Sequence, residues 1–350
     1  MATYIIVFAG VLFLALVGTP LARKLGLHLH AVDQPDPTRK VHTVPTPRLG
    51  GVAIFLSTLI ATLFLGEQYK INQLAGILVG SAFVSLLGLW DDRFSLSPWV
   101  KLLGQFVAVG LLIVSGVSIT TLRMPVLNYT ATGLWVVGIT NALNLLDNMD
   151  GLSGGIAAIA SGYFALMCSF TGQYLVGALS VAVMAACIGF LFYNWNPATI
   201  FMGDSGSLFL GFMLAAIGIK LRFPENVSFV TWMIPVIVLG VPVFDTTLVV
   251  ISRLRRRLNP LTTPGMDHSS HRLTYVGLSR REAVLVLYCV AFILGLVALF
   301  ITQASVLESY LMGGVVLLVG LYALWRMERP PFWPPQQKDT VAAISKSRSC

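Results

Sequence analysis

Eleven long apolar runs constrain the fold of this chain more than any other feature of its sequence. A helix needs about 20 apolar residues to cross the hydrocarbon core of a bilayer. The runs near this length are 4–22, 50–66, 72–90, 99–116, 129–146, 155–171, 174–193, 207–220, 228–250, 283–303 and 308–326. Only 11% of the residues are charged, whereas soluble domains carry about 25%. We therefore predict an all-α protein, a polytopic transmembrane helical bundle of about 11 spans.

The basic residues indicate how this bundle lies in the membrane. No basic segment precedes the first run, so we interpret residues 4–22 as a permanent span with its start outside, and not as a cleaved signal peptide. Alternating the sides from there places 19 of the 23 Lys and Arg residues on the inner side. This asymmetry follows the positive-inside rule and predicts a cytoplasmic C-terminus. Because the basic residues flank apolar spans, the net charge of +8 does not indicate a nucleic-acid partner.

The length and composition indicate one domain followed by a tail. The length suits a single helical bundle, and we assign residues 1–326 to a multi-span transmembrane domain. Residues 327–350 are rich in proline and polar residues. We therefore expect a disordered cytoplasmic tail there.

All ten aspartates also fall on the inner side or at its boundary. They are Asp33, Asp36, Asp91, Asp92, Asp147, Asp150, Asp204, Asp245, Asp267 and Asp339. The positive-inside rule does not require this, since acidic residues contribute little to orientation. A cationic cofactor shared on that face explains it.

Two adjacent carboxylates end the third predicted span. Asp91 and Asp92 face the negative end of the helix dipole and repel each other, so a purely structural role is disfavoured. We interpret the pair as facing a cation or taking a proton from a substrate. A solvated pair beside Arg93 is the alternative.

A polar stripe ends the fifth predicted span. Asn144, Asp147 and Asp150 follow one another at intervals of three, so they share a helix face. Polar groups at the end of a membrane helix usually face a cavity and mark function. Asp150 also fits the N-cap of the next span.

Three further residues suit the binding of a nucleotide and its phosphates. Asp204 precedes the eighth span in a glycine-rich segment, which suits a metal carboxylate beside amides that hold a phosphate, or a helix cap. Phe201 is interpreted as a stacking surface for a base or as an interfacial anchor. Arg48, beside two glycines that open a helix, suits a phosphate or an anionic lipid.

The longest inner loop, from Arg253 to Arg281, carries two histidines. His268 and His271 are three residues apart, a spacing that with a carboxylate suits zinc. The other acids of the inner face resemble a site of oxygen ligands, so magnesium is favoured. We interpret the histidines and Arg272 as pyrophosphate contacts. The inner loops together predict a magnesium-assisted phosphate site at the cytoplasmic interface.

Three motifs together resemble one enzyme family. NALNLLDNMDGLSGG (141–155), NWNPATIFMGDSGSLFLG (194–211) and DHSSHRL (267–273), with the preceding aspartate pair, resemble the polyprenyl-phosphate N-acetylhexosamine-1-phosphate transferases of glycosyltransferase family 4. The similarity is to the WecA and TagO type, with MraY more distant. It implies transfer of N-acetylglucosamine 1-phosphate from UDP-N-acetylglucosamine to undecaprenyl phosphate, with release of UMP, as the first lipid-linked step of a cell-surface polymer.

The resemblance also implies a setting and a role for each candidate residue. The enzyme would use magnesium, or manganese, on the cytoplasmic face of the cell (inner) membrane, and the resemblance admits a homodimer. Asp204 would bind the metal, with Asn144 as a second metal-site and substrate residue. The catalytic set would be Asp91, Asp92 and Asp147, with the pair near the lipid phosphate. The nucleotide-sugar would contact Arg48, Asp147, Asp150, Asn194, Phe201, His268, His271 and Arg272.

Two departures from the family pattern concern the metal and the sugar. Ser95 stands where many relatives carry a third aspartate, which argues against metal binding by the aspartate pair alone. Ser269 and Ser270 separate the two histidines, which leaves the sugar open. The clustered histidines of MraY are not found. Another UDP-sugar, such as UDP-MurNAc-pentapeptide or a different UDP-HexNAc, is the alternative donor. A membrane transporter is the alternative class, although transporters place polar groups near the bilayer midplane rather than at one edge.

Overall fold

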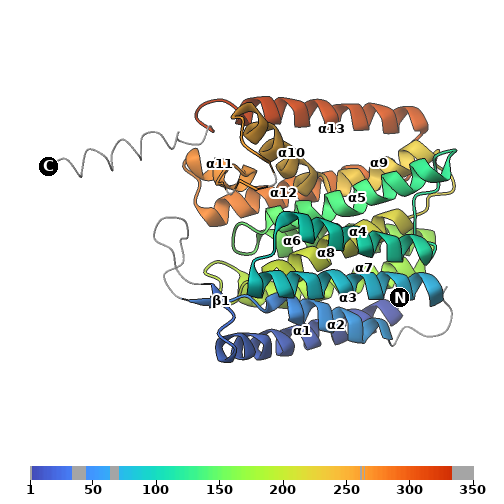
Figure 1. Cartoon of the computed structure of the whole chain (residues 1–350). Coiled ribbons are helices and arrows are strands. Elements are labelled where there is room, and N and C mark those ends of the chain that lie inside the picture. Colours follow the sequence, from blue (N-terminus) through green and yellow to red (C-terminus); the bar gives the residue numbers. More distant parts are fainter. Residues whose placement is uncertain (1, 34–44, 64–70, 261, 264, 333–350) are drawn as a thin grey trace.

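The computed structural model describes residues 2–33, 45–63, 71–260, 262–263 and 265–332. These residues form thirteen helices and one two-stranded antiparallel ribbon (Figure 1). The elements are α1 (Ala2–His28), β1 (Val32–Asp33), β2 (Thr46–Pro47), α2 (Gly50–Leu63), α3 (Ile71–Phe94), α4 (Pro98–Val114), α5 (Pro125–Leu146), α6 (Leu152–Thr171), α7 (Tyr174–Asn194), α8 (Gly203–Lys220), α9 (Ser228–Val238), α10 (Gly240–Arg255), α11 (Ser269–Tyr275), α12 (Arg280–Ile301) and α13 (Val306–Met327). The predicted helical class is confirmed.

Every predicted span coincides with one helix or with a pair of helices. Six of the described helices are long and apolar enough to cross a membrane, namely α1, α3, α6, α7, α12 and α13, and the number is seven if α9 and α10 count as one. Helices α2 and α4 are apolar but shorter. The chain is therefore a multi-pass membrane protein, and the number of 11 spans stays a prediction.

The predicted span 228–250 is not one helix. It is broken at Leu239 into α9 and α10, which are bent by 76°. Pro242 lacks the N–H that would bond the carbonyl of Val238 in a continuous helix, and a proline ring also clashes with that carbonyl. The bend turns α10 toward the end of the bundle at which the histidine loop lies.

Most connecting segments with polar residues lie at one end of the bundle. Helices α3 and α5 end there, α8 begins there, and both β1 and α11 lie there, at the left of Figure 1. We call this the polar end. The start of α1 lies at the opposite end and the end of α13 lies at the polar end (Figure 1), which is the arrangement that an odd number of crossings requires.

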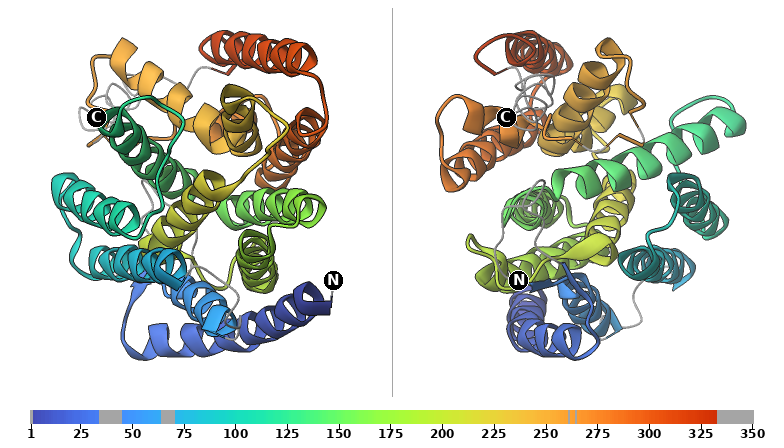
Figure 2. Two further views of the ribbon diagram at one scale, coloured as in Figure 1. Left: turned by 90° about the vertical axis from the view of Figure 1, so that its right-hand side faces the viewer. Right: turned by 60° about the vertical axis from the view of Figure 1, so that its left-hand side comes forward.

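Helix α8 is the centre of the bundle. Nearly all of its residues are buried, and the other helices surround it in both views of Figure 2. A Cβ atom on Gly51 would overlap Gly206, and one on Gly88 would overlap the backbone of Asp204. The absence of side chains at these glycines lets α2 and α3 touch α8 at its first turn, which positions the polar residues described below.

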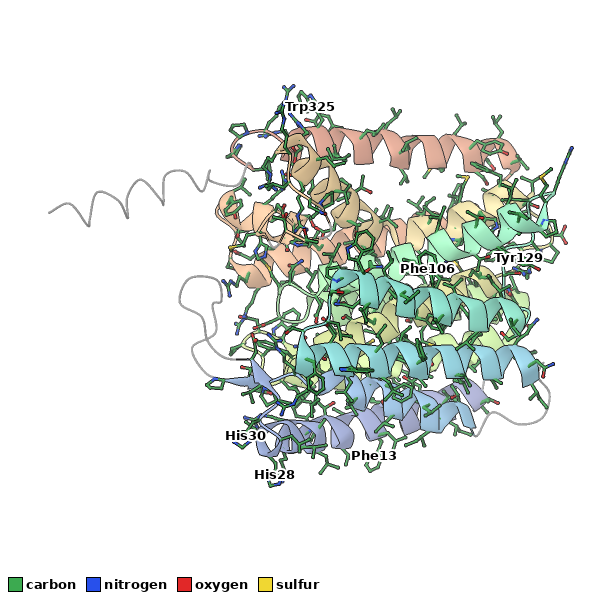
Figure 3. All side chains as sticks on the ribbon, viewed as in Figure 1. Phe13, His28, His30, Phe106, Tyr129 and Trp325 are labelled. Carbon is green, nitrogen blue, oxygen red and sulfur yellow. The ribbon has the colours of Figure 1, made fainter. Side chains whose placement is uncertain are left out.

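The outer surface of the bundle is apolar. Phe13, Phe106 and Trp325 are 66%, 47% and 47% exposed, and they project from different helices in Figure 3. A chain in water does not leave so many large apolar side chains exposed together. This surface fits contact with lipid.

The predicted tail divides into two parts. Residues 333–350, with Asp339, lie outside the described residues, as do Asp36 and the loop around it. Residues 328–332 are described, and Glu328 is only 4% exposed. The first residues assigned to the tail therefore pack against the bundle.

Candidate active site

Three carboxylates from two helices meet at the polar end. The two oxygens of Asp92 accept hydrogen bonds from the backbone N–H groups of Asp204, at 3.0 Å, and Ser205, at 3.2 Å. Asp92 at the end of α3 therefore satisfies donors at the start of α8. Gly203 precedes them with a φ of +72°, and a side chain there would overlap both Asp92 and the carbonyl of Arg48. The close approach needs glycine at this position.

Lys101 joins the other two carboxylates of this cluster. Its Nζ lies 2.7 Å from Asp91 Oδ2 and 2.5 Å from Asp204 Oδ2. Lys101 is one of the 19 basic residues expected on the inner side, and its contact with the carboxylates was not predicted. A lysine in the first turn of an apolar span, nine residues after the second aspartate of a pair, was the available signal.

Asn144 lies against the same aspartate. Its Nδ2 donates to Asp204 Oδ1, at 2.9 Å, and to Ser207 Oγ, at 2.9 Å. The Asp204 side chain is thus held by Asn144 and Lys101 and does not cap α8, whose N-cap position is Met202. The interpretation of Asp204 as a simple helix cap is wrong.

Asp147 follows the end of α5 as its C-cap residue. Burial, together with the negative charges of Asp204, Asp92 and Asp150, raises the pKa of Asp147 to about 8. The carboxyl group therefore holds a proton through most of the neutral range. A proton or a cation is needed where so many acids meet.

Two predicted substrate residues hold the loops together. Asn194 is 4% exposed, accepts from Gly151 N at 2.9 Å and donates to Ile200 O at 2.9 Å. Asp150 Oδ2 accepts from Asn196 Nδ2 and from the N–H of Ala198. Asn194 therefore joins two backbone segments, and its contact with substrate stays a prediction. Asp150 is not the N-cap of α6 either, since Gly151 is.

The histidine loop forms the short helix α11 at the same end. His268 is the N-cap residue and its ring centroid lies 6.1 Å from that of His271. Ser270 Oγ donates to Asn148 Oδ1 at 2.6 Å, which attaches this loop to the residue next to Asp147. Burial and the neighbouring His268 lower the pKa of His271 to about 4. His271 is therefore neutral at physiological pH.

Arg272 is bonded inside the protein, and its predicted contact with pyrophosphate stays a prediction. The side chain is 0% exposed. It donates to Asp267 O at 2.9 Å, Ser252 Oγ at 2.9 Å, Glu328 Oε1 at 2.7 Å and the carbonyl of Met327. Four of its N–H groups are thus used inside the protein, and Arg272 fastens α10, α11 and α13 to one another.

Arg48 and Phe201 lie on two segments that are joined by their backbones. Phe201 N donates to Pro47 O at 2.7 Å, and Gly50 N donates to Phe201 O at 3.0 Å. Arg48 forms an ion pair with Asp33 across the ribbon. Both side chains are partly exposed at the polar end, and their roles toward a nucleotide stay predictions.

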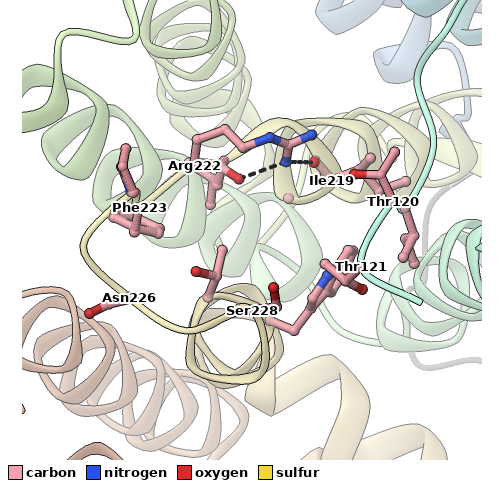
Figure 4. Close-up of a pocket in the computed structure, with 13 residues that line it drawn as sticks. Thr120, Thr121, Ile219, Arg222, Phe223, Asn226 and Ser228 are labelled. Carbon is pink, nitrogen blue, oxygen red and sulfur yellow. Dashed lines mark hydrogen bonds between the residues drawn. The ribbon is translucent and has the colours of Figure 1, made fainter. Parts of the chain in front are cut away.

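A cavity of about 500 Å³ lies at the opposite end of the molecule. It is lined by Thr120, Thr121, Arg222, Asn226 and Trp232, among others (Figure 4). Arg222 donates there to the carbonyl groups of Ile219 and Leu221, which end α8. The whole of α8 separates this cavity from Asp204, so it is not where the carboxylates act.

The donor set at the polar end fits a hard cation bound jointly with a ligand. Among the residues that the structure describes, no three His, Cys, Asp or Glu side chains converge as a metal site of their own. Magnesium is usually held by one or two carboxylates together with phosphate oxygens of a substrate. The carboxylates of Asp91 and Asp204, between which an ammonium group now lies, meet this requirement.

Comparison with known proteins agrees with these features. Residues 74–222 match the model of the glycosyl transferase family 4. The chain is 38% identical over 315 residues to a protein of Bacillus subtilis (strain 168) named probable undecaprenyl-phosphate N-acetylglucosaminyl 1-phosphate transferase, covering 87% of each chain. It is 33% identical to a decaprenyl-phosphate N-acetylglucosaminephosphotransferase of Mycobacterium leprae (strain TN), over 77% of this chain and 76% of the other. It is 31% identical to a phospho-N-acetylmuramoyl-pentapeptide-transferase of Bacillus cytotoxicus, over 85% and 97%. The chain therefore belongs to glycosyl transferase family 4, among the polyprenyl-phosphate N-acetylhexosamine 1-phosphate transferases.

Proposed function

We propose that this protein transfers N-acetylglucosamine 1-phosphate from UDP-N-acetylglucosamine to undecaprenyl phosphate or another polyprenyl phosphate. The observation that carries the proposal is the cluster of Asp91, Asp92, Lys101, Asn144 and Asp204 at one end of a lipid-facing bundle. A donor from water and an acceptor from the bilayer meet only at such an end. The sidedness of the basic residues supports a cytoplasmic position for the polar end, in the inner membrane.

The reaction needs one displacement at phosphorus. An oxygen of the lipid phosphate forms a bond to the β-phosphorus of the nucleotide-sugar, and the bond from that phosphorus to the bridging oxygen breaks. The electron pair leaves with UMP. Phosphoryl transfer depends on positioning and on neutralisation of charge more than on covalent help from the protein. We therefore favour direct attack over an aspartyl intermediate.

Four residues of the cluster, Asp91, Asp92, Asn144 and Asp204, have a task in this scheme. Asp204 and Asp91 would hold magnesium, with manganese as the alternative, and Asn144 orients Asp204. When bound, the metal neutralises charge on the pyrophosphate as bonds change. Asp92 fixes the first turn of α8 through its two backbone bonds. Lipid phosphates are largely ionised at neutral pH, so the position of Asp92 matters more than its strength as a base.

The test is UMP release by purified protein with undecaprenyl phosphate, magnesium and a panel of UDP-sugars. UDP-N-acetylglucosamine should be the fastest donor. UDP-MurNAc-pentapeptide is the second candidate, because the chain also matches a phospho-N-acetylmuramoyl-pentapeptide-transferase at 31% identity. If no UDP-sugar yields UMP while proteoliposomes accumulate one of them, the protein is a transporter and the proposal is wrong.

A further inference from the structure

A buried carboxylate outside the cluster holds the histidine loop. Asp245, in α10, is 0% exposed. Its Oδ1 accepts from Ser269 N at 2.7 Å and from Ser269 Oγ at 2.6 Å, and its Oδ2 lies 2.8 Å from His268 Nδ1. A carboxylate this deeply buried is costly unless such bonds satisfy it.

The geometry decides which nitrogen of His268 carries a proton. An ionised carboxylate is only an acceptor, so Nδ1 must be the donor in the contact with Asp245. Nε2 is then the ring nitrogen that this contact leaves for a ligand. The same logic applies wherever a carboxylate holds a histidine from behind, since the bond at one nitrogen determines what the other can do.

The helix break places this carboxylate where it acts. Asp245 lies in α10 shortly after the 76° bend at Leu239, and α10 reaches α11 only because of that bend. Ser270, two residues after His268, bonds to Asn148 beside Asp147. His268 is thus held by the buried carboxylate, and Ser270 of the same short helix is bonded to the loop beside Asp147.

We propose that Asp245 is a positioning residue of the transferase: it holds His268 with Nδ1 protonated and turned inward, so that Nε2 faces the nucleotide-sugar. The proposal rests on the proposed function and on the interpretation of the two histidines as pyrophosphate contacts. Asp245 itself touches no substrate. The alternative is a purely structural role, in which Asp245 only caps the first turn of α11 through Ser269. The test must distinguish this role from the positioning of His268.

A double-mutant cycle separates the two roles. Asp245→Asn keeps the shape but presents an amide that disrupts the bond to Nδ1. We expect Asp245→Asn and His268→Gln each to lower kcat/KM for UDP-N-acetylglucosamine by about 10- to 100-fold, with KM for undecaprenyl phosphate within about twofold of that of the parent. In the double variant the loss should equal that of His268→Gln alone, because Asp245 acts through His268.

The matched control is Asp267→Asn. Asp267 is also buried in this loop, but it pairs with Arg253 and Arg256. Asp267→Asn should lower the Tm. Its fold-loss in kcat/KM should multiply with the fold-loss caused by His268→Gln. If the fold-losses in kcat/KM caused by Asp245→Asn and His268→Gln also multiply in the double variant, Asp245 is structural and the proposal is overturned.

A spectroscopic readout does not depend on turnover. The ¹⁵N shifts of the imidazole ring, assigned by loss of the signal in His268→Gln, should show His268 protonated at Nδ1, and Asp245→Asn should change that pattern. A ring protonated only at Nε2 would overturn the proposal even in an active enzyme. If the parent protein releases no UMP but shows Nδ1 protonation, the proposed function fails while the geometry of the pair stands.

Discussion

Lys101 contacts carboxylates from two helices, and its charge offsets theirs. Without the ammonium group, Asp91 and Asp204 face each other with no cation between them. We expect Lys101→Met to lower UMP release by about tenfold or more and to lower the Tm, because like charges then repel at short range. Added magnesium should raise the Tm of Lys101→Met more than that of the parent protein, as measured by thermal unfolding in detergent.

The control for Lys101→Met is Lys220→Met at the opposite end of α8. Lys220 Nζ bonds to Gln73 Oε1 at 2.6 Å, far from the carboxylates. Its UMP release should stay within about twofold of the parent value. An equal loss of activity in both variants would show that charge in general, and not the position of Lys101, is what matters.

The residues that anchor the start of α8 should be needed for turnover. We expect Asp204→Ala and Asp92→Asn each to lower kcat by about 100-fold or more, since removal of one preorganised charged or donor group typically costs this much. UMP release measures it. Cys289→Ala, at an exposed position of α12, serves as the control. Turnover near the parent value in either aspartate variant would remove that residue from its assigned role.

At the scale of single elements, small residues decide how closely the helices approach. Gly88→Ala places a Cβ against the backbone of Asp204, so α3 and α8 must separate. We expect a loss of about 1–3 kcal/mol in stability and at least a tenfold loss of UMP release. Gly138→Ala is the matched control, because no atom lies within 4 Å of a Cβ there. A Gly88→Ala enzyme with normal activity would show that the approach of these helices is not needed.

The end of α13 is fastened to the histidine loop by buried charges. Glu328 pairs with Arg272 at 2.7 Å and with Arg255 at 3.1 Å. Glu328→Ala leaves Arg272 buried without its partner, which costs about 3–5 kcal/mol for a buried pair. We expect a lower Tm and faster proteolysis of the 256–280 segment. Glu308→Ala, at the exposed capping box of α13, should change the Tm much less, and similar losses in both variants would contradict this role of Glu328.

At the scale of the whole molecule, the polar end and the cavity lie on opposite sides of the membrane in the proposed topology. Ser95 is exposed at the polar end and Arg123 is exposed at the other. In a protein whose native cysteines are replaced, an impermeant maleimide should label Arg123→Cys in spheroplasts and Ser95→Cys only in inverted vesicles. Labelling of both positions from one side would refute the orientation.

The positions of the helices follow from local properties of the sequence. The contacts within the candidate site do not. Every apolar run became helical because burial in lipid leaves the backbone no other partner than itself. The break at Leu239 was missed, although Pro242 signalled it. Asn144 and Asp204 were grouped from the family resemblance, and the structure places their side chains in contact. The internal bonds of Arg272 and Asn194 were not predicted, because the sequence does not show which distant carbonyls and carboxylates their donors reach.

The sequence by itself determined that the chain is a helical membrane protein, that its polar loops share one side, and that its motifs are those of a transferase family. These properties depend on hydropathy and charge read along the chain. Only the tertiary structure decided that Lys101 joins the carboxylates, that Asp245 holds His268, and that Arg272 bonds to Ser252 and Glu328. These contacts join residues that lie far apart in the chain. They depend on how closely the helices pack and on the bend of 76° between α9 and α10. The sequence does not give the distances between helices or the angle of this bend.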